Sequence, residues 1–135
     1  MKRLRILLII LVVSLVSIVI LGAIPGTLSA CPIDIKPWSN PNSINLRSNG
    51  VVPVAILGEA GFDPCTKVDP ATVLFEGAAP VHFACEDVNS DGIMDMIFHF
   101  RVRDTGLTSS STTGTLTWAG GSASDSVRIV GGGRG

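Results

Sequence analysis

The sequence predicts an all-β fold, an immunoglobulin-like β-sandwich of about seven or eight strands. Short segments in which apolar and polar residues alternate recur along the chain, as in half-buried strands. Clusters of Gly, Pro, Asn and Ser separate these segments at short intervals. No helical periodicity appears after residue 30. The Cys and Trp spacing of antibody domains is absent, so the prediction concerns the architecture only.

Residues 1–30 are expected to precede this domain as a signal peptide or a membrane-anchoring helix. Three basic residues lie within the first five positions, and the run 6–24 is almost entirely apolar. That order is typical of an export signal, and the run is also long enough to span a bilayer as a helix. We therefore divide the chain into this segment, a β domain over 31–130 and a Gly-rich tail over 131–135.

The end of the N-terminal segment resembles a bacterial lipoprotein signal. It reads Leu28-Ser29-Ala30-Cys31, which would make Cys31 a lipidation site and the new N-terminus. Pro25 and Gly26 separate it from the apolar run, where lipoprotein signals usually have little gap. Ordinary cleavage after Ala30, lipidation and an uncleaved helix therefore stay open, and all three imply export.

Eight segments are expected to form strands. In chain order they are Ile33–Ile35, Ile44–Leu46, Val51–Leu57, Thr72–Glu76, Val81–Ala84, Met96–Val102, Thr115–Trp118 and Ser126–Val130. The strongest is 96–102, which places Met96, Phe98, Phe100 and Val102 on one face. The strand 51–57 is apolar on both faces, but Pro53 lacks a ladder donor and predicts an edge position or a bulge.

The connections between these strands follow from turn residues. A dense turn cluster fills 37–42, and 59–70 is expected to be a loop because it contains Gly61, Pro64 and Pro70. A polar Ser/Thr-rich loop is expected at 104–114. Gly120-Gly121-Ser122 is expected to connect the last two strands as a hairpin.

The chain has three cysteines, Cys31, Cys65 and Cys85, and the state of Cys31 determines which of them can pair. If Cys31 carries a lipid, Cys65 and Cys85 are free to form a disulfide in an oxidising compartment. If it does not, Cys31 could itself be a bridge partner. A zinc site is not expected, because there is no CxxC pair and no set of His and Cys at ligand spacing.

Charge argues against a nucleic-acid partner. Residues 31–135 carry seven basic against eleven acidic side chains, so 7 − 11 gives a formal net charge of −4. An acidic domain without a basic patch and with few aromatic residues is a poor nucleic-acid binder.

The segment EDVNSDGIMD, residues 86–95, predicts a calcium site. Its oxygen-bearing side chains and its glycine recur at the spacing of a cation loop, with Asp87, Asn89 and Asp91 at positions 1, 3 and 5 and Gly92 at position 6. Ile93 at position 7 would donate its carbonyl oxygen, and Asp95 stands at position 9. Calcium binds six to eight hard oxygens, and glycine permits the sharp turn. The alternative is a solvated turn, since Asp, Asn, Ser and Gly all favour turns.

This loop is not a complete EF-hand. Position 12 is Phe98, inside an expected strand, where the EF-hand needs a bidentate carboxylate. The pattern instead resembles the Asp-rich loops of integrin α-chain repeats. Asp95, water or a second segment would complete the shell, and Glu86 and Asp104 are the candidates.

Several motifs together resemble one family of exported bacterial and archaeal β domains of uncharacterised function. They are IDIKP at 33–37, PNSIN at 41–45, GVVPVAILG at 50–58, VDPATV at 68–73, EDVNSDG at 86–92 and DTGL at 104–107. Members usually have glycine where this chain has Trp38 and Ser90. The resemblance implies a β domain with a calcium loop, often appended to larger surface proteins, and it implies no activity.

The predicted function is a non-enzymatic, exported calcium-binding module with a structural or adhesive role, held at the cell surface through its N-terminal lipid or helix or else secreted. A carbohydrate-binding module is the alternative, with Trp38 or Trp118 stacking on a glycan. A small hydrolase using an Asp and a His is the third, but His82 and His99 lie on separate expected strands and have no GxSxG serine beside them. The partners expected are therefore calcium, the membrane, and a glycan or another surface protein.

Overall fold

The computed structural model describes residues 32–131, which belong to one compact unit, Cys31–Gly135. The fold is mostly β, as predicted. The described part holds nine strands rather than seven or eight: β1 Ile33–Ile35, β2 Ser43–Asn45, β3 Val51–Ile56, β4 Leu74–Phe75, β5 His82–Glu86, β6 Asp95–Arg101, β7 Thr113–Trp118, β8 Gly121–Ser126 and β9 Arg128–Val130. Three short helices accompany them: α2 Pro64–Lys67, η2 Pro70–Thr72 and η3 Val102–Asp104.

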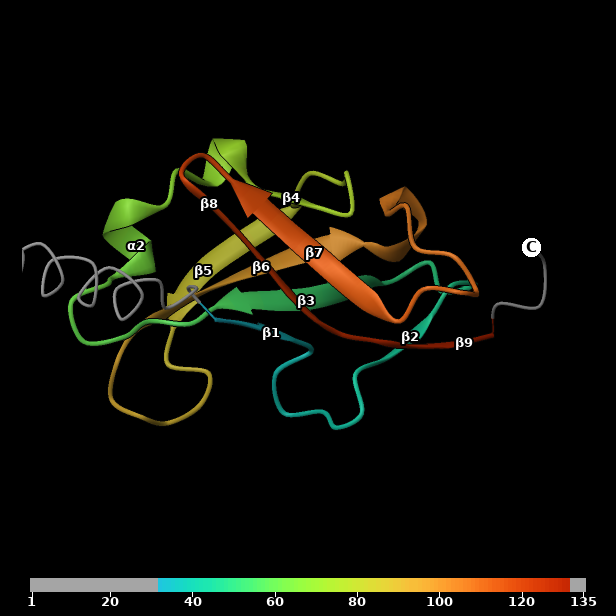
Figure 1. Cartoon of the computed structure of the whole chain (residues 1–135), viewed down its shortest axis with the longest axis horizontal. Coiled ribbons are helices and arrows are strands. Elements are labelled where there is room, and N and C mark those ends of the chain that lie inside the picture. Colours follow the sequence, from blue (N-terminus) through green and yellow to red (C-terminus); the bar gives the residue numbers. More distant parts are fainter. Residues whose placement is uncertain (1–31, 132–135) are drawn as a thin grey trace, which may run out of the picture. The chain divides into compact units, whose positions relative to one another are not determined.

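The strands form two main sheets and one small one. Strands β1-β3-β6-β5 make a four-stranded antiparallel sheet, and β4-β7-β8 make a three-stranded antiparallel sheet. Strands β2 and β9 pair in parallel. In Figure 1, β7 and β8 cross in front of β3 and β6. Side chains of both main sheets share one buried cluster, so the sheets face each other across it.

The period-two pattern of β6 determines which side chains enter this core. Met96, Phe98 and Phe100 point into it, where they join Phe75 of β4 and Leu116 of β7. The predicted face of this strand is therefore confirmed. Ile97 lies on the opposite face of the sheet, in a small second cluster that includes Ala55 and Val88.

The prediction that Pro53 marks an edge or a bulge is wrong. Strand β3 lies between β1 and β6, and Pro53 pairs in regular register with His99. Its missing N–H would face β1, but β1 ends at Ile35 and Lys36 has a φ of 52°. The Lys36 carbonyl turns away to accept from Ser39. Proline is tolerated because the neighbouring strand ends beside it.

The loop expected over 59–70 contains the helix α2 and the start of η2. Asp63 caps α2 by accepting from the N–H of Cys65, and Asp69 caps η2 in the same way from Ala71. Each cap is followed by a proline at the first helical position, where a missing N–H costs nothing. The expected strand 72–76 shortens to β4 because η2 occupies its start.

The last expected strand, 126–130, is split between two sheets. β8 ends at Ser126 and β9 begins at Arg128, with the side chain of Val127 buried between them. The hairpin from β7 turns at Ala119-Gly120, where Gly120 has a φ of 96°, and Gly121 is already the first residue of β8. The expected connection at 120–122 was therefore placed one to two residues late.

Several predictions fall outside the described residues: the signal or anchor over 1–30, lipidation of Cys31 and the tail beyond 131. Within residues 32–131, no helix is both long enough and apolar enough to cross a membrane.

Candidate metal site

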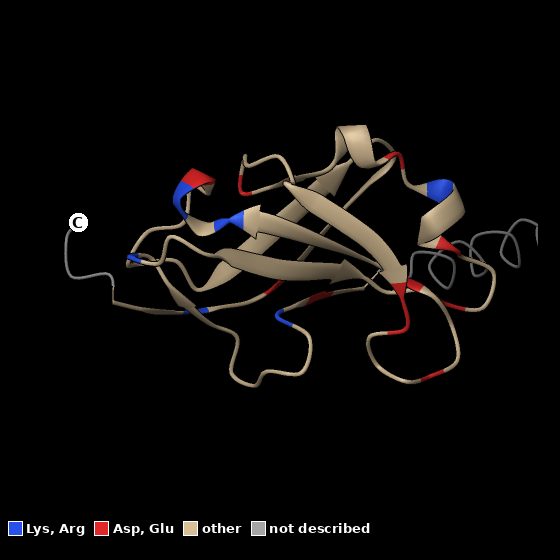
Figure 2. Cartoon of the chain, turned by 180° about the vertical axis from the view of Figure 1, so that it is seen from behind, with Lys and Arg blue, Asp and Glu red and all other residues tan. Residues whose placement is uncertain are grey.

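The acidic segment connects two neighbouring strands of the four-stranded sheet. Asp87 follows the last residue of β5, and Asp95 is the first residue of β6. Figure 2 shows acidic residues on this loop and no Lys or Arg. The negative charge of the loop therefore has no basic side chain within the segment to balance it.

The fold brings the carboxylates of positions 1, 5 and 9 together. One carboxylate oxygen from each of Asp87, Asp91 and Asp95 lies within 4.8 Å of the other two. Calcium–oxygen distances are 2.3–2.6 Å, so two oxygens on the same ion lie at most about 5 Å apart. The three carboxylates are thus close enough to share one cation.

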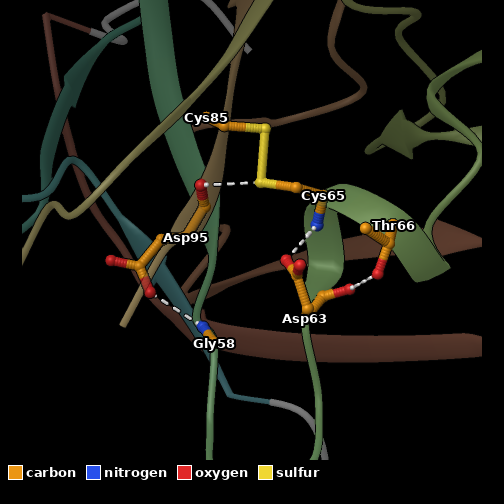
Figure 3. The surroundings of a disulfide bond; sticks show 6 residues. All are labelled: Gly58, Asp63, Cys65, Thr66, Cys85 and Asp95. Atoms are coloured by element: carbon orange, nitrogen blue, oxygen red, sulfur yellow. Dashed lines mark hydrogen bonds between the residues drawn. A yellow bond between two sulfur atoms is a disulfide. The ribbon is translucent and has the colours of Figure 1, made fainter. Parts of the chain in front are cut away.

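Asp95 is fully buried and is fixed by two backbone donors. Its Oδ1 accepts from the N–H of Gly58 at 2.7 Å, and its Oδ2 accepts from the N–H of Val88 at 2.8 Å. Figure 3 shows the bond to Gly58. Each carboxylate oxygen can accept about two hydrogen bonds, so each retains a lone pair for a cation. Sequence spacing predicted Asp95 as a candidate ligand but not as the link between the loop and the end of β3.

Asp87 is held in its charged form by the loop backbone. Its Oδ2 accepts from Gly92 at 2.8 Å, and its Oδ1 accepts from Asp91 at 3.2 Å. The N–H of Gly92 is the main cause that lowers the pKa of Asp87 below its usual value. Desolvation opposes it as the next largest effect, and the N–H groups of Asp91, Ser90 and Asn89 lower the pKa further. A carboxylate held ionised in this way is suited to bind a cation.

The remaining loop residues curl the backbone around these side chains. Asp91 Oδ1 accepts from the N–H of Ile93 at 2.9 Å, and Asn89 Oδ1 lies 3.4 Å from the N–H of Asp91. Ser90 and Gly92 have φ values of 60° and 83°. Glycine adopts this left-handed region without steric cost, whereas serine is strained there.

The two candidates for a further ligand are not part of the cluster. Asp104 ends η3, beyond the opposite end of β6 from Asp95. Seven residues of strand span roughly 20 Å, so Asp104 is excluded as a ligand of the same ion. Glu86 stands opposite Asp95 in the register of β5 and β6, but the group of three close carboxylates does not include it.

Cys65 of α2 and Cys85 of β5 are joined in a disulfide, with their Cα atoms 6.2 Å apart. The Sγ of Cys65 lies 3.4 Å from the backbone carbonyl oxygen of Asp95. A disulfide sulfur carries no hydrogen, so this is a packing contact and not a hydrogen bond. As Figure 3 shows, the disulfide fastens α2 beside the residue whose side chain belongs to the acidic cluster.

The two histidines, predicted on separate strands, are cross-strand neighbours. His82 and His99 pair in register, with ring centroids 5.5 Å apart. The Nδ1 of His99 is buried and has no hydrogen-bond partner. Among the described residues, no hydrogen bond joins either imidazole to an acidic side chain.

The two tryptophans have different environments. Trp118 is 8% exposed and packs in the core between the sheets. Trp38 is 74% exposed and has a φ of 73°. Only Trp38 could present its ring to a ligand.

Comparison of the chain with protein-family models, with curated proteins and with solved structures finds no match. Function must therefore be inferred from the geometry of the site.

Proposed function

We propose that this chain is a calcium-binding β domain, exported and held at the cell surface, with a structural or adhesive role and no catalytic one. The observation that supports this most is the approach of three carboxylate oxygens, from Asp87, Asp91 and Asp95, to within 4.8 Å of one another. Like charges at this separation repel each other unless a cation lies among them.

The donor set favours calcium over other metals. Three carboxylates, the amide oxygen of Asn89 and the carbonyl oxygen of Ile93 would give only hard oxygen ligands, with water completing the shell. Calcium accepts six to eight such ligands in flexible geometry, whereas magnesium demands a tighter octahedron and gives up its water reluctantly. Zinc and copper favour His and Cys ligands.

The expected effect of the ion is structural. Asp95 already links the loop to Gly58 and to the start of β6. A cation bound to Asp87, Asp91 and Asp95 would remove the repulsion within the loop and fasten it to the sheet. Calcium would thus stabilise one end of the four-stranded sheet, which suits a domain working outside the cell.

We also propose an immunoglobulin-like architecture and a location outside the cell. Two facing sheets support an immunoglobulin-like sandwich, and the Cys65–Cys85 disulfide supports an oxidising compartment. Both agree with membership of the resembled family of exported domains. Attachment would come from lipid on Cys31 or from the apolar run over 6–24.

Thermal unfolding with and without calcium tests the proposal. Stabilisation by a ligand that binds only the folded state reaches about 2.7 kcal/mol at one hundred times the dissociation constant. We therefore expect a higher melting temperature in calcium than in EDTA, and a smaller shift with magnesium. Asp91→Asn removes one charge while its Oδ1 can still accept from Ile93, and it should abolish most of the shift.

Asp104→Asn is the matched control, because this acid lies at the opposite end of β6 and should leave the calcium shift unchanged. If calcium leaves the melting temperature of the wild type unchanged, and calorimetry detects no heat of binding at millimolar calcium, the segment is a solvated turn and the proposal is refuted.

A carbohydrate-binding role is the second candidate, and the exposure of Trp38 is the observation that favours it. A bulky residue in the left-handed region is strained, and such strain often marks a functional position. A glycan array with wild type and Trp38→Gly separates the candidates, since a real glycan signal should disappear in the variant while the calcium shift remains. Trp118 is withdrawn as a stacking residue because it lies in the core.

A further inference from the structure

The four-stranded sheet ends at β5, and within residues 32–131 no strand pairs with the outer side of β5. The N–H of Val102 donates to Gly50, so alternate residues of β6 bond to β3, and those between them face β5. Their register partners on β5 are His82, Ala84 and Glu86. The backbone groups of the two residues between these, Phe83 and Cys85, consequently point away from the sheet.

The other edges of the two main sheets are closed or polar. At β1, the N–H of Ile35 donates to the Asp125 carboxylate of β8 at 3.0 Å. At β4, Phe75 exchanges two hydrogen bonds with Ala78, both 2.9 Å long. β8 itself has the sequence GSASDS and carries no large apolar side chain.

β5 differs because its edge is both open and apolar. Phe83 is 46% exposed, and its ring packs against Phe98 with centroids 5.9 Å apart. Val81, just before the strand, is also exposed, and an apolar hollow lined partly by Pro70, Pro80 and Phe83 lies beside it. Unpaired strand edges of this kind are templates for a further strand.

The sequence of β5 is complementary to itself in antiparallel pairing. If a twofold axis passes beside Ala84, Phe83 of one copy lies opposite Cys85 of the second copy. Both residues have outward-facing backbone groups, so the two copies can exchange four hydrogen bonds. The same register places His82 opposite Glu86 of the second copy, twice per dimer, where an imidazole N–H can donate to the carboxylate.

Other registers lose this match. A twofold axis beside Phe83 would place His82 opposite Ala84 and Glu86 opposite Pro80. An axis beside Cys85 would place His82 opposite Val88. Directly opposed residues in non-hydrogen-bonded pairs are the closest across a sheet. The pair of His82 with Glu86 of the second copy would therefore contribute most to choosing the register.

We propose that β5 is a docking strand for a second copy of this chain, giving a twofold dimer whose four-stranded sheets join edge to edge. The partner is the same chain because β5 supplies both halves of the match: its free backbone groups pair with each other, and His82 of each copy meets Glu86 of the other. Isologous pairing of this kind closes after two copies and leaves no further edge at β5. The inference does not depend on the metal site.

Self-crosslinking tests the register in the full chain expressed in its own oxidising compartment. Cα atoms of a directly opposed, non-hydrogen-bonded pair lie about 4.5 Å apart, which is within disulfide range. Ala84→Cys should therefore give a covalent dimer on a non-reducing gel. His82→Cys is the matched control on the same strand and face. Its counterpart in the second copy would lie four residues along the strand, about 13 Å away at about 3.3 Å per residue, so this variant should give no covalent dimer.

A charge exchange tests the energetics by sedimentation of the full chain in density-matched detergent. Glu86→Lys removes the acceptor at both symmetry-related pairs and should weaken the dimer about tenfold. The double variant His82→Glu/Glu86→Lys restores opposite charges and should recover most of that loss. An unchanged calcium shift in each variant would show that the neighbouring loop is intact.

Three results would overturn the proposal. A monomeric wild type at high concentration is the first. The second is equal crosslinking of Ala84→Cys and His82→Cys, which would indicate random collision. The third is a dimer that the single and double charge variants leave unaltered, which would place the interface elsewhere in the chain.

Discussion

Asp95 joins three parts of the molecule at one side chain. Its carboxylate accepts from Val88 at the start of the loop and from Gly58 after β3, and it faces Asp87 and Asp91. Burying a carboxylate without a counter-charge is costly, and the two backbone donors offset only part of that cost. A cation in the cluster would supply the missing charge, so the burial of Asp95 and the proposed calcium site support each other.

Asp34 makes stability depend on pH in the opposite sense to a carboxylate in an ion pair. Partial burial, and then the charges of Asp125 and Asp95, raise the pKa of Asp34 above 3.8. As pH rises through 3.8, the unfolded chain releases this proton first, so stability falls until pH passes the folded-state pKa. The penalty is therefore complete at neutral pH and absent well below 3.8.

Asp34→Asn should remove this penalty. We expect a gain of up to about 0.5 kcal/mol at pH 7, because the side chain is only partly buried, and no gain at pH 3. Urea unfolding at the two pH values, in EDTA so that no cation screens Asp95, measures the difference. Asp104→Asn is the comparison, and equal effects of Asp34→Asn at both pH values would contradict the assignment.

At the residue scale, side-chain patterns were predicted better than backbone conformation. The loop spacing identified Asp87, Asp91 and Asp95, which the fold brings together. The left-handed conformation of Trp38 and Ser90 had only an indirect signal, the glycine that the resembled family usually carries at both positions. Burial of the Asp95 side chain depends on Gly58, which is 37 residues away along the chain, and no local pattern contains that information.

At the level of elements, the end of β3 is shaped to receive the acidic loop. A Cβ atom at Gly58 would overlap the backbone carbonyl oxygen of Met94 and lie 2.8 Å from Cγ2 of Ile93. Only glycine permits this approach, and the same residue donates its N–H to Asp95. The last glycine of the motif GVVPVAILG, Gly58, therefore has a specific role in docking the loop.

Gly58→Ala should push the loop away from β3. We expect a loss of about 1–3 kcal/mol, as in other overpacked sites, and weaker calcium binding because Asp95 loses its position. Urea unfolding in EDTA and calorimetric titration with calcium measure the two effects. Gly50→Ala is the matched control, since the added Cβ would meet only the flexible side chain of Ser48 at 3.1 Å. An affinity equal to that of wild type would show that the loop binds without docking.

Elements were predictable where a local period was long enough. β6 has seven residues, long enough for a period of two to show although Ile97 on its second face is also apolar, and its core face was predicted correctly. α2 has four residues, less than the two turns that a helical period needs, and its signal lies in the Asp63-Pro64 cap instead. The change of sheet at Val127 does not interrupt the alternation of 126–130. The pattern therefore predicts one strand where the fold has the last residue of β8 and all of β9.

At the scale of the described unit, two sheets enclose one apolar core, and a covalent bridge joins a connecting helix to the sheet edge. The disulfide links α2 to β5, across 20 residues that include β4. It therefore fastens the segment that leads from the four-stranded sheet to the three-stranded one and back. The same α2 lies against the first residue of β6 through the contact between Cys65 and Asp95.

The double variant Cys65→Ser/Cys85→Ser separates this covalent restraint from the proposed calcium site. Closing a loop of this length contributes about 3 kcal/mol in the chain-entropy description, so urea unfolding should show a loss of that order. The calcium-dependent gain should persist, because the Asp95 carboxylate is held by Gly58 and Val88 and the disulfide contacts only its backbone. Wild type in reducing agent should behave like the variant, and adding the reducing agent to the variant should not change its stability. If breaking the bridge also abolishes the calcium shift, then α2 and not the end of β3 sets the position of Asp95.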